Sequence, residues 1–161
     1  MTKITDTDRD AGRHGRGFAE AAKPRWAPLP ALLDDLAGES FAEFHAQLRE
    51  AGHPAIRQGH GCVFRFVQEG GLRLTDLAES SGLSKQAVGE VVDDLEKLGY
   101  VERIQDPEDG RAKLIRLTER GADAQQTALK IFADIERGWA KRYGAERVAT
   151  MRQLLEELGG L

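Results

Sequence analysis

Residues 100–121 read YVERIQDPEDGRAKLIRLTERG and place an arginine just beyond a turn. Two short runs, 100–105 and 111–117, flank the sequence DPEDG, whose residue types are typical of a hairpin turn. An arginine that leaves such a tip can enter a narrow DNA minor groove, where the negative potential attracts it. Asp109, two residues before Arg111, could hold the guanidinium through a bidentate pair. The predicted chemistry is therefore presentation of a positioned cation to DNA.

Two short predicted helices joined by a glycine precede this hairpin. Thr75 is a candidate N-cap for a helix through Ser80, and Gly82 supplies a sharp stop. Ser84 then caps a second helix, which Gly99 ends. The second helix has one apolar stripe, formed by Val88, Val91, Val92, Leu95 and Leu98. This pattern indicates a helix-turn-helix, and a hairpin directly after it makes a winged helix.

The side of the second helix opposite its apolar stripe carries residues that could contact DNA. Gln86 can pair with adenine, Lys85 with phosphate or guanine, and Ser84 with phosphate at the helix start. Gly89 leaves room for a close approach. A solvated helix face is the alternative for these positions, but the wing favours DNA contact. The predicted DNA-binding residues are Ser84, Lys85, Gln86, Gly89, Arg103, Asp109, Arg111 and Lys113.

The charge balance argues against a generally basic DNA-binding surface. The 161-residue chain has 23 basic and 27 acidic side chains, a net charge of −4. Residues 71–121 alone hold eight Lys or Arg and eleven Asp or Glu, a net charge of −3. Outward-facing Glu90 and Asp93 could accept from cytosine or limit non-specific binding by repelling phosphate. Affinity for DNA must then come from a few placed cations, and a winged module that binds protein instead stays an open alternative.

The rest of the chain predicts long amphipathic helices, so the expected fold class is mostly α with a small β-wing. Apolar residues recur at helical spacing over 29–50, and Pro54 begins a second predicted helix through about Glu69. Thr118 begins a long helix that Gly144 ends, and a last helix follows to Leu158. The apolar stripes of the first and last two helices are too wide for one small domain, which predicts a partner subunit. Residues 1–25, poor in large apolar side chains, are predicted to be a disordered arm.

The whole arrangement resembles the MarR family of winged-helix transcription regulators. A family DP-x-D-x-R wing pattern appears as Asp106, Pro107, Asp109 and Arg111. The family's LT-x-x-G pattern after the second wing strand appears as Leu117, Thr118 and Gly121. The resemblance implies one domain over 26–158, with dimerisation helices at 29–52 and 119–158 and a winged helix-turn-helix at 54–118. It also implies a homodimer that binds a pseudo-palindromic double-stranded operator.

Many members of the family release DNA when a small, often aromatic, molecule binds between the dimer helices and the winged domain. The resemblance therefore implies a ligand-responsive repressor, with His45, His60 and Phe64 as candidate lining of the effector pocket. His60 shares a helix face with apolar residues, so a hydrogen-bonded core histidine is the alternative for it. A metal-responsive regulator would need His45, His53 and His60 as zinc ligands, and their spacing does not favour it.

Several other classes of function are disfavoured by what the sequence contains. No nucleophile–base pair, phosphate loop or paired acids stand at a meaningful spacing, so we expect neither an enzyme nor a cofactor. No run of about 18 apolar residues predicts a membrane span. The single cysteine, Cys62, excludes an internal disulfide and fits the reducing cytoplasm. No basic residue near it promises a reactive thiolate, which favours an inert packed cysteine over a redox sensor.

Overall fold

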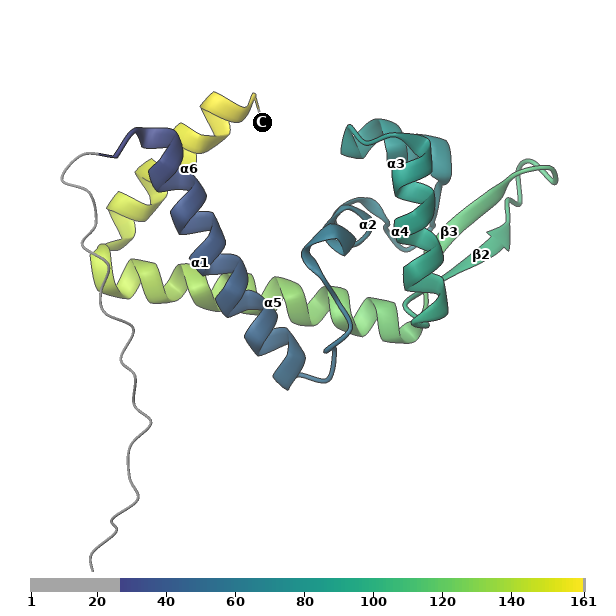
Figure 1. The fold of residues 1–161 in the computed structure, drawn as a ribbon, viewed down its shortest axis with the longest axis horizontal. Coiled ribbons are helices and arrows are strands. Elements are labelled where there is room, and N and C mark those ends of the chain that lie inside the picture. The colour runs from purple at the N-terminus through teal and green to yellow at the C-terminus, as the bar shows by residue number, and fades with distance from the viewer. Residues whose placement is uncertain (1–26, 161) are drawn as a thin grey trace, which may run out of the picture.

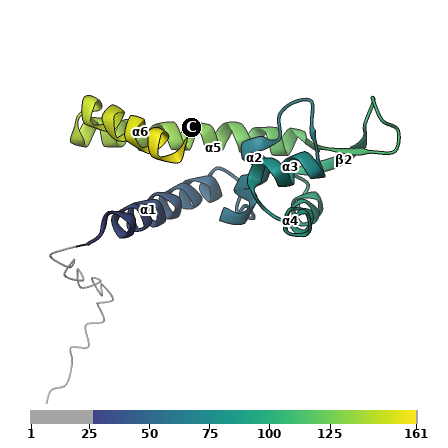
Figure 2. The same cartoon turned by 90° about the horizontal axis from the view of Figure 1, so that it is seen from above.

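A computed structural model of the chain describes residues 27–160, and the predicted arm at 1–25 lies outside this range. Two groups of elements stand at opposite ends of a long helix (Figure 1). At one end α1 (Leu29–Glu50) and α6 (Ala145–Gly159) pack against α5 (Glu119–Tyr143). At the other end the winged lobe lies beside the first turns of α5 (Figure 2). None of the helices within 27–160 is both long and apolar enough to cross a bilayer.

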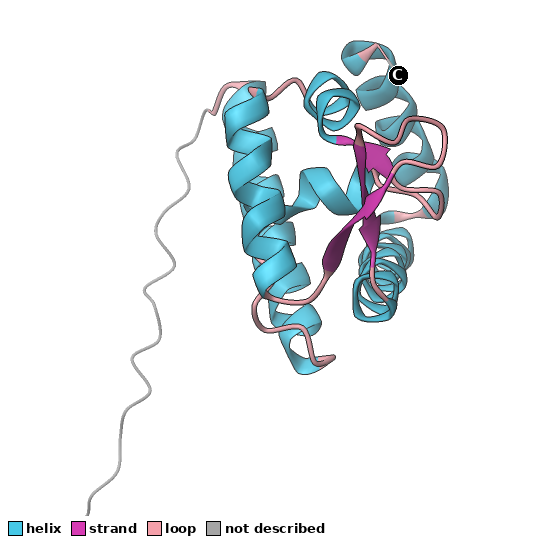
Figure 3. Cartoon of the chain, turned by 90° about the vertical axis from the view of Figure 1, so that its right-hand side faces the viewer, coloured by secondary structure: helices cyan, strands magenta, loops and turns pink. Residues whose placement is uncertain are grey.

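The winged lobe combines short helices with a small antiparallel sheet. Its helical elements are η1 (Gln58–His60), α2 (Gly61–Phe66), α3 (Leu74–Ser81) and α4 (Lys85–Lys97). Its strands, β1 (Leu72–Arg73), β2 (Val101–Gln105) and β3 (Lys113–Leu117), lie in the order β1-β3-β2 and are seen from the winged end in Figure 3. The fully buried side chains of the lobe are Val63, Val67, Leu77, Val88, Val92, Leu95, Tyr100, Val101 and Ile115. This core fixes α4 against the sheet, as expected for a winged helix.

The helix ends follow the capping chemistry of the sequence. Ser84 Oγ accepts a hydrogen bond of 3.2 Å from the Ala87 N–H, and Gly82 turns the chain between α3 and α4 with a φ of 67°. Thr118 Oγ1 accepts from the Gly121 N–H at 3.1 Å and donates to the Gly99 carbonyl at 2.7 Å. The predicted caps at Ser84 and Thr118 are therefore confirmed, and so is the helix break at Gly144.

A close approach between α5 and β2 accounts for the glycine of the LT-x-x-G pattern. A Cβ atom at Gly121 would lie 2.0 Å from the carbonyl oxygen of Tyr100. No side chain can occupy that space, since non-bonded carbon and oxygen atoms do not approach so closely. Gly121 therefore lets the long helix leave the wing directly beside the strand.

Three local predictions were wrong, and one strand was not predicted. The predicted helix from Pro54 to Glu69 is limited to η1 and α2, because Arg57 is extended and its backbone N–H donates to His60 Nδ1 instead of a helical carbonyl. Thr75 is not an N-cap, since α3 already begins at Leu74. The second wing strand begins at Lys113, so Arg111 lies in the turn. The sequence also gave no signal for β1, which has only two residues and forms by pairing with β3.

Candidate nucleic-acid interface

The first turn of α4 presents its polar residues to solvent. Val88, Val92 and Leu95 are completely buried, so the opposite face of the helix is exposed. Ser84, Lys85 and Gln86 are all exposed at the helix start. This end carries unsatisfied backbone N–H groups and the positive end of the helix dipole, which suit a phosphate group.

Two further positions lie on the same face of α4. The Gln86 amide donates to Glu90 Oε1 at 3.2 Å, one helical turn on, and both residues are exposed. This pair limits the side-chain positions of Gln86 without removing it from the surface. Gly89 has no atom within 4 Å of the position of an added Cβ, so the space above it is open. An incoming ligand can thus approach the α4 backbone at this point.

The wing tip is ordered by carboxylates that accept backbone N–H groups. Asp109 Oδ1 accepts from the Arg111 N–H at 3.1 Å, and Asp106 Oδ1 accepts from the Glu108 N–H at 2.8 Å. The predicted bidentate pair between Asp109 and the Arg111 guanidinium is not present. Asp109 instead fixes the backbone of the turn, which leaves the exposed guanidinium of Arg111 projecting from an ordered loop. Lys113 is also exposed, at the start of β3.

An ion pair that sequence reasoning missed fastens the wing to β1. Arg73 Nε donates to Asp106 Oδ2 at 2.7 Å, and Asp106 is only 5% exposed. The Glu108 N–H first, and Arg73 second, lower the pKa of Asp106 from its ordinary value. The two residues are 33 positions apart, and only the β1–β3 pairing brings them together. The Asp106-Pro107 sequence of the wing pattern was the available signal for a structural carboxylate, but nothing in it identifies Arg73 as the partner.

Arg103 does not contribute an available cation. Its guanidinium contacts Asp93, at 2.5 Å, and Glu96, both on α4, and its side chain is only 25% exposed. The pairing ties β2 to α4, and it gives outward-facing Asp93 a structural partner. In this structure Arg103 positions β2 against α4, and its predicted contact with DNA stays a prediction. Within residues 27–160, Lys85, Arg111 and Lys113 form no ion pair.

A pocket of about 790 Å³ lies between α1, α2 and α5, beside the winged lobe. His45 and Phe64 line it, as predicted for an effector site. Its apolar wall includes stacked Phe44 and Phe132, whose ring centroids are 4.2 Å apart. The Nε2 atom of His45 is buried without a hydrogen-bond partner in the described chain, and burial is the main cause of its lowered pKa. A mostly apolar ligand with one polar group suits such a lining.

His60 is the exception among the three predicted pocket residues. It is 4% exposed and does not line the pocket. Its Nδ1 accepts from the Arg57 N–H at 3.2 Å, which places the ring proton on Nε2, 2.9 Å from Asp94 Oδ2. His60 is thus the hydrogen-bonded core histidine that the sequence offered as the alternative.

His53 and Cys62, the other residues considered for metal binding or redox sensing, both have contacts that fit a structural role. His53 is buried, with Nε2 3.1 Å from Asp123 Oδ2. No cluster of three His, Cys, Asp or Glu side chains able to hold a metal occurs within 27–160. Cys62 lines the pocket, and its Sγ lies 3.5 Å from the Gly59 carbonyl. Burial raises the pKa of its thiol, which favours the unreactive protonated form.

Comparison with known proteins points to one family. The sequence profile described as the MarR family matches residues 57–112. The HTH-type transcriptional regulator YdcH of Bacillus subtilis is 40% identical over 102 residues, which cover 63% of this chain and 66% of that protein. A crystal structure of MarR superposes with a TM-score of 0.66 and 24% identity, over 83% of this chain and 96% of that one. The transcriptional repressor CouR, bound to a 23-mer DNA duplex, gives 0.68 and 19% identity, over 82% and 92%. The two structural likenesses show a common fold.

Proposed function

We propose, from the premise that this chain belongs to the MarR family of DNA-binding transcription regulators, that it is a homodimeric, ligand-responsive repressor of a pseudo-palindromic operator. One observation carries the DNA-binding part of this proposal. Carboxylates of the acidic winged lobe neutralise Arg73, Arg103 and Arg116, yet Lys85, Arg111 and Lys113 are exposed and form no ion pair within residues 27–160. These three stand at the start of α4 and on the wing, where a winged helix meets the major groove and the adjacent backbone or minor groove.

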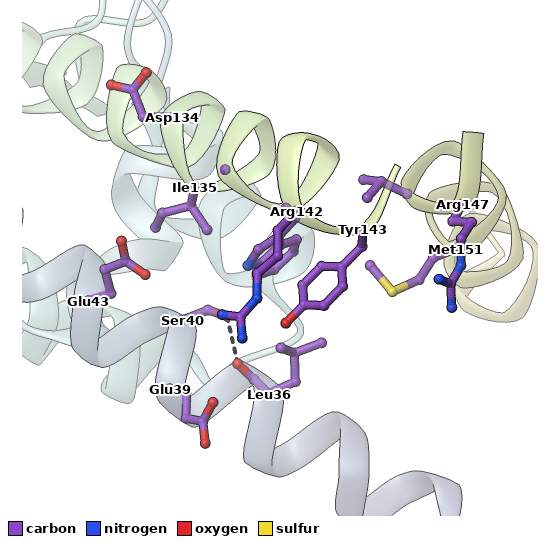
Figure 4. Close-up of a pocket in the computed structure, with 13 residues that line it drawn as sticks. Leu36, Glu39, Ser40, Glu43, Asp134, Ile135, Arg142, Tyr143, Arg147 and Met151 are labelled. Carbon is purple, nitrogen blue, oxygen red and sulfur yellow. Dashed lines mark hydrogen bonds between the residues drawn. The ribbon is translucent and has the colours of Figure 1, made fainter. Parts of the chain in front are cut away.

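The homodimer is supported by α6, a helix that leaves large apolar side chains exposed in the part of the chain that the structure describes. None of its 15 residues is buried, and Leu154, Leu155 and Leu158 are 52%, 39% and 76% exposed. A pocket of about 700 Å³ opens where α1 faces the junction of α5 and α6, with Leu36, Tyr143 and Met151 among its lining (Figure 4). A second copy of these helices would cover both the exposed leucines and this pocket. Single exposed leucines are normal on a protein surface, but a continuous apolar face marks an interface.

The ligand-responsive part rests on the pocket lined by His45 and Phe64. It touches α1 and α5, which belong to the proposed dimer region, and α2, which belongs to the winged lobe. An occupant can therefore favour one separation of the two winged lobes over another. It shifts DNA affinity only by the difference between its own affinities for the two states.

The direct test is selection of a DNA site by the full chain from a random-sequence pool. We expect a site with two inverted half-sites about one helical turn apart, ~34 Å, and an affinity that falls as salt rises. Few cations face DNA, so the salt dependence should be shallower than that of a basic regulator. Selection of no sequence, with the protein folded, would contradict the proposal.

A further inference from the structure

Arg57 stands at the meeting point of the pocket and the recognition helix. It belongs to the segment that leads from α1 into the winged lobe, and its guanidinium pairs with Asp94 of α4. His60, three residues on, contacts the same carboxylate oxygen, with Nε2 2.9 Å from Asp94 Oδ2. Asp94 thus ties α4 to this segment through two polar contacts. The His60 hydrogen bond first, and Arg57 second, lower the pKa of Asp94, so the carboxylate is charged at neutral pH.

The two contacts to Asp94 differ in their surroundings. The His60 side chain is 5% exposed, so its bond to Asp94 is shielded from water. The Arg57 side chain is 69% exposed and that of Asp94 is 36% exposed. An exposed ion pair is screened by solvent and adds little net stability. Arg57 can therefore exchange Asp94 for another anion at low cost, whereas His60 cannot leave without burying an unpaired group.

The pocket supplies a reason for such an exchange. Arg57 and Arg65 both line it, and its lining has no carboxylate, although acidic residues outnumber basic ones in the chain. Its remaining walls are mainly apolar, with Phe41, Phe44 and Phe132 packed against one another. A charged group in surroundings of low polarity attracts an opposite charge more strongly than it does in water. The pocket thus suits an anion with an apolar body.

We propose that Arg57 is the positioning residue through which the pocket acts on the recognition helix. In the unoccupied protein its guanidinium holds Asp94 and steadies α4. An anionic occupant of the pocket draws the guanidinium away, and α4 is then held to this segment by His60 alone. This inference rests on the proposed function, because it presumes that α4 reads DNA and that the pocket takes a ligand.

Two matched probes separate a charge effect from a volume effect. Salicylate is an aromatic carboxylate, and salicylamide is its neutral counterpart of nearly the same shape. Arg137→Gln is the matched control for Arg57→Gln, because Arg137 is a similarly exposed arginine, at 71%, that also pairs with a carboxylate, Asp134, but does not line this pocket. Arg57→Lys keeps the positive charge and tests rescue.

The first measurement is affinity for the selected DNA site with each probe at saturation. In the parent and in Arg137→Gln, salicylate should weaken binding by about 5–150-fold and salicylamide by clearly less. In Arg57→Gln the two probes should act alike, and Arg57→Lys should restore part of the difference. A merely structural role of Arg57 would lower stability without removing the dependence on probe charge. Equal effects of the probes on the parent, or a difference that persists in Arg57→Gln, would overturn the proposal.

The second measurement needs no DNA, so it remains decisive if the proposed function fails. Amide hydrogen exchange should rise in α4 when salicylate is added to the parent, and not in α5 beyond its first turns. The same addition should leave α4 of Arg57→Gln unchanged. If no DNA site is selected but this exchange pattern appears, the proposed function is wrong and the role of Arg57 stands. Absence of saturable salicylate binding, or exchange that rises equally in Arg57→Gln, would overturn the role of Arg57.

Discussion

At the scale of single residues, Arg111 is positioned through its backbone and not through its guanidinium. The carboxylate of Asp109 accepts its N–H, and the Asp106–Arg73 pair anchors the strand end that carries the loop. The side chain itself is exposed and unpaired within the described chain. Such an arrangement lowers the entropy lost when the residue binds, because only the side chain remains to be ordered.

Arg111→Ala should therefore weaken operator binding by about 1–3 kcal/mol while the protein stays folded. Arg116→Ala is the matched control, since Arg116 is an exposed arginine of the same wing that already pairs with Glu102 at 2.8 Å. Titration of labelled operator by each variant measures the difference. Equal losses in the two variants would mean that charge, and not position, carries the contact.

Asp106 makes the stability of the folded chain depend on pH in the acidic range. Its pKa is lower in the folded chain than the ordinary value of 3.8. Such a group stabilises the fold fully above its ordinary value, and this contribution is lost as pH falls through the folded pKa. The parent should therefore lose more stability than Asp106→Asn as pH falls below about 4, and should be the more stable of the two at pH 7. Denaturant unfolding over a pH series tests this, with exposed Glu108→Gln as control.

The residue scale also shows where sequence reasoning succeeds and where it stops. The cap at Ser84 and the exposure of Gln86 could be predicted because a cap and a helix face are local patterns. Arg73 could not, because its partner is distant in sequence and β1 forms only by pairing in the folded sheet. The ion pairs of Arg103 were missed for a related reason. Its pairing with Asp93 and Glu96 depends on how β2 packs against α4, which no spacing in the sequence specifies.

At the scale of elements, glycines distinguish a packed helix face from an open one. Gly121 faces the Tyr100 carbonyl at a distance that excludes a side chain, whereas Gly89 faces open space. Caps and apolar spacing predicted where the long helices lie. They did not predict what each helix face contacts, so the sequence alone could not distinguish Gly121 from Gly89. The segment 54–69 shows the converse. Its apolar pattern resembled a helix, yet the hydrogen bond from the Arg57 N–H to His60 Nδ1 ends the regular pattern.

Alanine at these two glycines should have opposite effects on stability. Gly121→Ala should destabilise the fold by about 3 kcal/mol, the upper part of the range for overpacking, because backbone must move. Gly89→Ala should stabilise α4 by up to about 1 kcal/mol, the difference in helix propensity. The same Gly89→Ala should weaken operator binding if DNA approaches this face closely. Thermal unfolding and operator titration of both variants test these expectations, and unchanged operator affinity in Gly89→Ala would remove position 89 from the interface.

At the scale of the whole molecule, the winged lobe and the helices at the other end of α5 differ in how completely they bury their apolar side chains. The winged lobe has its own buried core, with side chains such as Leu77 and Val92 completely buried. The helices at the other end have wide exposed apolar faces, and α6 has no buried residue at all. The wide apolar stripes in the sequence predicted this surplus, because their area exceeds what one short chain can cover. Which surfaces meet in a second copy depends on shape, which periodicity does not contain.

Leu158→Asp provides the sharpest test of the proposed dimer. In an isolated chain this change should have almost no effect, because the Leu158 side chain is 76% exposed. In a homodimer built on α6 it places an unpaired charge in an apolar interface, and we expect a monomer in sedimentation equilibrium. Gln153→Asp, which adds a charge to an exposed polar position of the same helix, is the control. A parent that sediments as a monomer at micromolar concentration would contradict the dimer.

The same variant separates the affinity of one winged lobe from that of two. Each lobe keeps Lys85, Arg111 and its wing in Leu158→Asp, so binding to a single half-site should be retained. Binding to the full operator should fall by roughly 10²–10⁴-fold, because linking two binding sites raises avidity by about that factor. Titration of one-half-site and two-half-site DNA by the parent and the variant gives the four affinities needed. If the variant is monomeric but binds both DNAs as the parent does, dimerisation does not contribute to recognition, and one lobe reads the operator alone.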